Sequence, residues 1–158
     1  MQRLKNSECQ LVFRTNLFIK LETLSTVSYV RAKNLVVNNG LNLVRDLLGG
    51  NALPPSHIGV GTGTTPVVAS DSAIETEVFR SLITRRIPSP QSIRFQLFLG
   101  SGEANGNTLT EAGIIETGVQ NGSAGDPGLL VARVVYSPIN KTSGLEVTYN
   151  WDLDLTAT

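Results

Sequence analysis

The chain is poor in charged side chains. They make up 16% of its 158 residues, and 13 Lys and Arg balance 13 Asp and Glu, so the formal net charge is zero. A protein that binds nucleic acid through its phosphates needs a basic surplus, which this chain lacks. Soluble monomers commonly carry about 25% charged residues. The deficit therefore favours a subunit that associates with other protein surfaces.

Cysteine and histidine occur once each, as Cys9 and His57. A single cysteine excludes an internal disulfide, and structural zinc sites take four Cys or His ligands. A Ser/His/Asp triad would need Ser56 or Ser70 beside His57, but neither serine lies in a nucleophile-elbow motif. We interpret His57 as a loop or strand-edge residue. We therefore predict no enzymatic activity, no cofactor and no metal at these residues.

Long apolar runs are also missing. None approaches the roughly 18–20 residues of a membrane span, and no apolar stretch follows the first ten residues as in a secretory signal. We therefore expect no membrane partner. Residues 1–9 are polar and predict an N-terminal arm. The remaining residues, 10–158, are enough for a single domain with a sizeable core.

What the chain does have is alternation of apolar and polar residues, which is typical of half-buried strands. The first two strands predict an antiparallel hairpin. Apolar residues occupy nearly both faces of 129–136, so we expect that strand inside a sheet. The predicted strands are 11–21, 27–37, 58–60, 82–87, 93–99, 110–117, 129–136 and 145–155.

Residues 40–48 carry the clearest helical spacing. Four apolar residues recur there at positions that share one helix face. They are Leu41, Val44, Leu47 and Leu48. Asn38 or Asn39 can cap the first turn, and Gly49-Gly50 supplies a left-handed stop.

A second, shorter helix is predicted at 73–79, because Ser72 and Glu75 fit the S-x-x-E capping box. The fold class that follows is mainly β. We expect an antiparallel β-sandwich or open barrel of about eight to nine strands, with the 40–48 helix packed across one end.

The glycine-rich segment GVGTGTT begins at Gly59. A dinucleotide fingerprint needs G-x-G-x-x-G at the start of a helix, where the pyrophosphate binds. Here the glycines are evenly spaced, Pro66 follows, and the phosphate-loop Gly-Lys-Ser/Thr is missing. We interpret the segment as a strand and turn where backbones approach closely.

Acidic residues mark the outward face of the last strand. Asp152 and Asp154, with Glu146, could bind calcium together with Asp126, or could form a solvated face or lie opposite arginines. The loop 120–128 is the likeliest insertion tip. Together the glycines, this loop and the acidic face are the candidate interaction surface. Its residues are Gly59, Gly61, Gly63, Asn121, Asp126, Asp152 and Asp154.

Five segments, in order, resemble the tail-collar or tail-fibre attachment domains of tailed bacteriophages. They are NLVVNNGLNLVRDLLGG, HIGVGTGTT, AIETEVFR, EAGIIET and LLVARVVYSPINKTSGLEVTYNWDLDL. The resemblance implies a non-enzymatic virion protein at the tail, neck or baseplate, assembled in the host bacterial cytoplasm. It also implies docking to fibres or other tail proteins, and a homo-oligomer, either a trimer or a ring.

Two alternatives stay open. Small all-β subunits also act as capsid decoration, or cement, proteins, and the polar residues 1–9 could reach a neighbour. A host-glycan-binding β-module would need an aromatic stacking platform, for which Trp151, Tyr149 and Tyr136 are candidates. Trp151 shares the apolar face of the last strand, which favours a place in the core.

Overall fold

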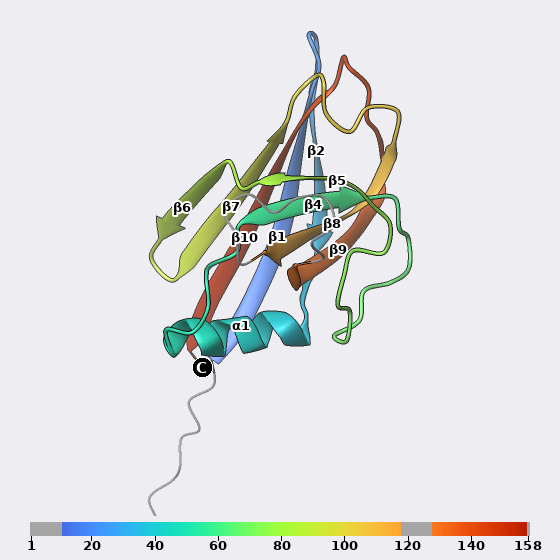
Figure 1. The fold of residues 1–158 in the computed structure, drawn as a ribbon. Coiled ribbons are helices and arrows are strands. Elements are labelled where there is room, and N and C mark those ends of the chain that lie inside the picture. Colours follow the sequence, from blue (N-terminus) through green and yellow to red (C-terminus); the bar gives the residue numbers. More distant parts are fainter. Residues whose placement is uncertain (1–10, 118–127, 158) are drawn as a thin grey trace, which may run out of the picture.

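The computed structural model describes residues 11–117 and 128–157 of the chain. The predicted arm 1–9 and the candidate residues Asn121 and Asp126 lie outside the described residues. The described chain forms two five-stranded antiparallel sheets and one α-helix. Figure 1 shows how these elements are arranged. The predicted β-sandwich is confirmed, with ten strands instead of eight or nine.

The first sheet has the strand order β2-β1-β10-β7-β6. Its strands are β1 (Leu11–Glu22), β2 (Val27–Lys33), β6 (Arg85–Ser89), β7 (Ser92–Leu99) and β10 (Glu146–Ala157). The predicted hairpin of β1 and β2 is confirmed, with Lys20 opposite Tyr29. The last strand, β10, lies in the middle of the sheet and pairs with β1 from Leu11 to Glu22.

The second sheet has the order β3-β9-β8-β4-β5. Its strands are β3 (Leu35–Val36), β4 (His57–Gly61), β5 (Glu77–Leu82), β8 (Thr108–Glu116) and β9 (Leu129–Asn140). The strand predicted at 129–136 is β9, which has neighbours on both sides. Its interior position agrees with the apolar residues on both of its faces.

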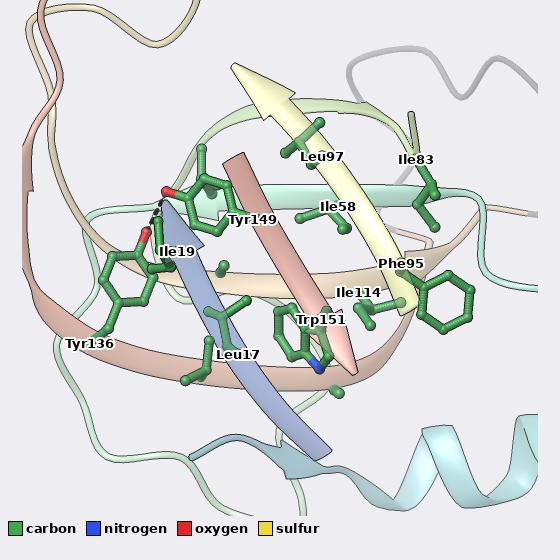
Figure 2. Packing of buried hydrophobic residues seen from close by; sticks show 14 of the residues in the cluster. Leu17, Ile19, Ile58, Ile83, Phe95, Leu97, Ile114, Tyr136, Tyr149 and Trp151 are labelled. Atoms are coloured by element: carbon green, nitrogen blue, oxygen red, sulfur yellow. Dashed lines mark hydrogen bonds between the residues drawn. The ribbon is translucent and has the colours of Figure 1, made fainter. Parts of the chain in front are cut away.

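The core lies between the sheets and follows the period-two pattern. Leu17 and Ile19 of β1 and Trp151 of β10 are fully buried, and Figure 2 shows them in one cluster with Ile58 and Ile114 of the second sheet. Burying a large apolar side chain contributes about 1.5–3 kcal/mol, so this layer is the main source of stability.

Two tyrosines bring polar groups into the core without leaving them unpaired. The hydroxyl oxygens of Tyr136 and Tyr149 lie 2.9 Å apart, and the Tyr136 hydroxyl donates to the backbone oxygen of Glu111 at 3.1 Å. Burial raises the pKa of both phenols. The hydroxyl pair is drawn in Figure 2.

The predicted helix is α1 (Asn38–Leu48), but its predicted apolar face is right only for Val44 and Leu47, which are partly buried. Gly40 and Leu43 are the buried positions, whereas Leu41 is 46% and Leu48 is 84% exposed. The cause lies in Gly40, where a Cβ would stand 2.1 Å from the backbone oxygen of Val131. The helix therefore approaches β9 along the face that carries this glycine.

The ends of α1 follow the sequence only in part. The N-cap is Val37, with no side-chain cap bond, so the expected asparagine cap is wrong. The Val37 backbone oxygen instead receives the N–H groups of Gly40 and Leu41. At the other end Gly50 has a φ of +72°, which confirms the left-handed stop.

The helix predicted at 73–79 is absent, because Glu77 already begins β5. The Glu75 carboxylate does not return to Ser72 as a capping box requires. It accepts instead from the backbone N–H of Thr65 at 2.9 Å and the Thr65 hydroxyl at 2.7 Å. The single strand predicted at 82–87 is likewise divided, because the chain passes from β5 in one sheet to β6 in the other.

Candidate functional site

A buried ionic cluster joins β8, β9 and the segment 62–76, which we call the covering loop. Arg133 of β9 is 2% exposed and Glu111 of β8 is fully buried. Arg133 donates from Nε to Glu111 at 2.9 Å, from Nη1 to Asp71 at 3.0 Å and from Nη2 to Glu75 at 3.1 Å. One guanidinium thus binds three carboxylates from three places in the sequence.

Glu111 also holds the backbone of the covering loop. Its carboxylate accepts the N–H groups of Gly63 at 2.8 Å, Thr76 at 2.7 Å and Glu75 at 3.0 Å. Charge-assisted bonds of this kind are stronger than bonds between neutral groups. No buried side-chain nitrogen or oxygen within 11–117 and 128–157 lacks a partner. Every buried polar atom of the cluster therefore has a partner within the chain, and the cluster holds the covering loop on the sheet.

The glycines of GVGTGTT make room for these contacts. A Cβ on Gly61 would stand 2.4 Å from the backbone oxygen of Thr76, and one on Gly63 would stand 2.4 Å from Oε1 of Glu111. The predicted close approach of backbones is therefore confirmed. Gly59, Gly61 and Gly63 are buried, so their place in the candidate interaction surface is corrected: they contact their own chain.

The covering loop also has an apolar anchor, Ile74, which is 7% exposed. Ile74 belongs to a small cluster with Val37, Ile115 and Leu130 on the side of the sheet that faces away from the main core. A Cβ on Gly59 would lie 2.6 Å from the δ-methyl of Ile74. Glycine in the strand therefore leaves the space that the isoleucine fills.

The charges of the cluster support one another. Hydrogen bonds from the Thr65 hydroxyl and N–H, helped by the Arg133 guanidinium, lower the pKa of Glu75. Burial disfavours the charged form of Arg133, but its bonds with Glu111 and Asp71 outweigh that cost and raise its pKa. These contacts therefore favour the charged forms of Glu75 and Arg133, and they fix the covering loop to β8 and β9.

The sole histidine lies close to a serine in a different arrangement from a hydrolase triad. Ser56 Oγ lies 2.7 Å from Nδ1 of His57 and 3.1 Å from the Thr117 hydroxyl. In a triad the serine binds Nε2, while Nδ1 faces the carboxylate. His57 opens β4 and is only 4% exposed, so its interpretation as a loop or strand-edge residue is corrected.

On the acidic face of β10, Asp152 and Asp154 lie opposite arginines, as one of the alternatives expected, whereas Glu146 lies opposite Glu22. Arg94 donates to both carboxylate oxygens of Asp152, at 2.6 and 2.8 Å, and Asp154 is paired in register with Arg14. Within the described ranges no group of three or more His, Cys, Asp or Glu residues is placed to hold a metal ion.

The aromatic residues considered for sugar stacking are core residues. Trp151 and Tyr149 are fully buried and Tyr136 is 6% exposed. Figure 2 shows all three pointing into the cluster between the sheets. Since a stacking platform must offer an exposed ring face, these rings cannot provide one in this fold.

Sequence reasoning missed Lys141, which is 1% exposed. Its Nζ donates to the backbone oxygens of Gly100 and Thr142 and to the Asn105 side chain, at 2.9 to 3.0 Å. Burial lowers the pKa of Lys141. The lysine fixes the loop between β7 and β8 to the end of β9, and no local pattern marks it.

Comparison of the chain with models of protein families, with curated proteins and with solved structures found no match. In the part of the chain that the structure describes, α1 is too short to be a membrane-crossing helix.

Proposed function

We propose that the chain is a non-enzymatic structural protein of a tailed-phage virion, at the tail, neck or baseplate, where it docks fibres or other tail proteins. The main support is that motifs of the resemblance meet at one place. Gly63 comes from HIGVGTGTT, Glu75 from AIETEVFR, Glu111 from EAGIIET and Arg133 from LLVAR. All four join the same buried cluster.

This convergence favours a structural role for the motifs. The donors of Arg133 are bound to carboxylates of the same chain, and Glu111 binds the backbone of the covering loop. A cluster whose charges pair with one another rigidifies and positions a chain segment. The low total charge adds support, because it suits a subunit surrounded by other subunits.

The test is to locate the protein in particles. Gold-labelled antibody raised against the purified chain should mark the tail, neck or baseplate of virions in negative-stain images. Particles with no label, while the same antibody detects the protein in the infected cell, would refute the virion proposal. Antibody against a known head protein of the same particles is the matched control.

Copy number separates the tail from the head. Quantitative mass spectrometry of purified particles should give roughly three to a dozen copies if the chain forms a trimer or ring, since closed cyclic assemblies repeat one interface. Hundreds of copies would instead support the capsid decoration alternative.

A further inference from the structure

The most exposed apolar side chains lie in two groups at opposite ends of the molecule. The β1–β2 hairpin carries Leu24 in its turn, which is fully exposed, and Tyr29 on β2, which is 68% exposed. The other end carries Leu48, which is 84% exposed, and Leu41 on α1, followed by Leu53. Figure 1 shows the β1–β2 turn at the top of the view and α1 at the bottom.

The first group, which we call the hairpin tip, is apolar with an acidic border. It consists of Leu24, Val27 and Tyr29, with Glu22 and Glu146 beside them. The two glutamates are directly opposite in the pairing of β1 and β10, and they border a hollow of about 460 Å³ together with Leu24. Like charges in opposed positions destabilise a sheet. Lys20 pairs with Glu22 at 2.6 Å, so Glu146, which has no ion pair among the described residues, is the carboxylate that a cation from outside would bind.

The second group, which we call the helix face, is apolar with a basic centre. Leu41, Arg45 and Leu48 are spaced i, i+4 and i+7 and therefore share one side of α1. The Arg45 side chain is 69% exposed. It donates to both carboxylate oxygens of its neighbour Asp46, at 2.8 and 3.0 Å, and to the Asn42 side chain at 3.3 Å. Exposed pairs of this kind contribute little, so the guanidinium is free to exchange its partner.

We propose that the chain associates head to tail, with the hairpin tip of one copy docked on the helix face of the next. The occupant is a second copy, because one end offers apolar side chains beside carboxylates and the other offers apolar side chains beside a guanidinium. Two different patches in contact make a heterologous interface, which closes into a ring or continues as a filament. This association is a property of the chain itself and does not depend on a virion location.

The experiment measures sedimentation of the purified full chain and of two variants, Leu24→Lys and Leu48→Lys. The wild type should form oligomers at concentrations above about 10 µM, the range of a small interface. Each variant alone should be monomeric. An equimolar mixture of the two should form heterodimers, because each variant keeps the patch that the other has lost. Larger species should not form from the mixture.

Charge reversal tests the same interface independently. Glu146→Lys and Arg45→Glu should each weaken association at least tenfold, and a chain that carries both changes should recover it. Leu82→Lys is the matched control, because Leu82 is 44% exposed on β5, away from both patches, and it should leave association unchanged. Circular dichroism of every variant verifies folding.

Three results would overturn the proposal. They are a wild type that stays monomeric, a mixture of the two leucine variants that yields no heterodimer, and a Leu82→Lys variant that dissociates as much as the others. The first removes self-association itself. The second would mean that the hairpin tip of one molecule does not bind the helix face of another. The third would mean that the interface includes a surface outside these two patches.

Discussion

Arg133 on β9 reaches diagonally across the sheet to Glu111 on β8, and its Nε lies 2.9 Å from the carboxylate with both side chains almost inaccessible to solvent. The two are neighbours in space although 22 residues separate them in sequence. A buried pair of this kind is costly to break, because the remaining charge stays in a medium of low polarity.

Replacing one partner of this pair should therefore be strongly destabilising. We expect Arg133→Met to lower the free energy of unfolding by about 3–5 kcal/mol, because Glu111, Asp71 and Glu75 lose their shared cation. Urea unfolding followed by tryptophan fluorescence of Trp151 measures it. The control is Arg94→Met, which breaks a pair whose arginine is 43% exposed and should cost no more than about 1 kcal/mol. Equal losses would contradict the prediction.

The covering loop should loosen in acid. The folded pKa of Glu75 lies below its ordinary value of 4.5, so the folded state binds fewer protons than the unfolded state near that pH. The stabilisation is present in full above pH 4.5 and is lost as the pH falls through the folded pKa. Amide hydrogen exchange of residues 62–76 should therefore accelerate as the pH falls below 4.5, after correction for intrinsic rates.

Two variants test the origin of this pH dependence. Glu75→Gln should exchange fast already at neutral pH and respond less to acid. Thr65→Val removes the hydroxyl donor to Glu75, so its transition should move toward pH 4.5. A wild-type profile in both variants would show that another carboxylate controls the loop.

The strand glycines should not tolerate even one methyl group. Gly61→Ala places a Cβ against the Thr76 backbone oxygen and Glu111. We expect this overpacking to lower the free energy of unfolding by about 1–3 kcal/mol. Thermal unfolding checks this against Gly144→Ala, where nothing lies within 4 Å of the added Cβ and the change should stay within about 0.5 kcal/mol.

A pair of substitutions tests whether a steric clash causes the loss of stability expected at Gly59. Gly59→Ala should be destabilising because its methyl meets the δ-methyl of Ile74. Ile74→Val removes that methyl, so the double variant should be more stable than the sum of the two single effects. Strict additivity would mean that the clash is relieved in some other way.

Lys141→Met should detach the loop between β7 and β8. The apolar stem keeps its packing, but the acceptors on Gly100, Asn105 and Thr142 lose their donor. We expect the unsatisfied acceptors to lower the free energy of unfolding by about 1–3 kcal/mol, and we expect faster proteolysis within residues 100–107. Lys20→Met, at a partly exposed side chain, is the control and should leave the loop protected.

The strands were predictable because their pattern is local. A face that packs against the other sheet imposes apolar residues at every second position, and β1, β7 and β10 follow that rule. The helix was also predictable, but its face was only half predicted, because the deciding residue is Gly40, whose missing side chain lets the helix approach β9. The spacing of apolar residues gives no sign of such a contact at a glycine.

The ionic cluster could not be read from local pattern, since Asp71 and Arg133 lie 62 residues apart. The same distance explains the mistaken helix at 73–79. Ser72 and Glu75 satisfy a local capping rule, but Thr65 and Arg133 offer the glutamate stronger partners. Tertiary contacts decided the outcome, as they commonly do for short segments of weak helical preference.

The place of β10 between β1 and β7 has a consequence for biosynthesis. A ribosome delivers residues 11–22 well before residues 146–157, yet these strands pair along their whole length. Until the last of them emerges, β1 and β7 expose the edges and apolar faces that β10 will cover. The first sheet therefore stays incomplete until β10 has been synthesised. Pairing between strands so distant in sequence is slow, and the exposed strands are prone to aggregation in the meantime.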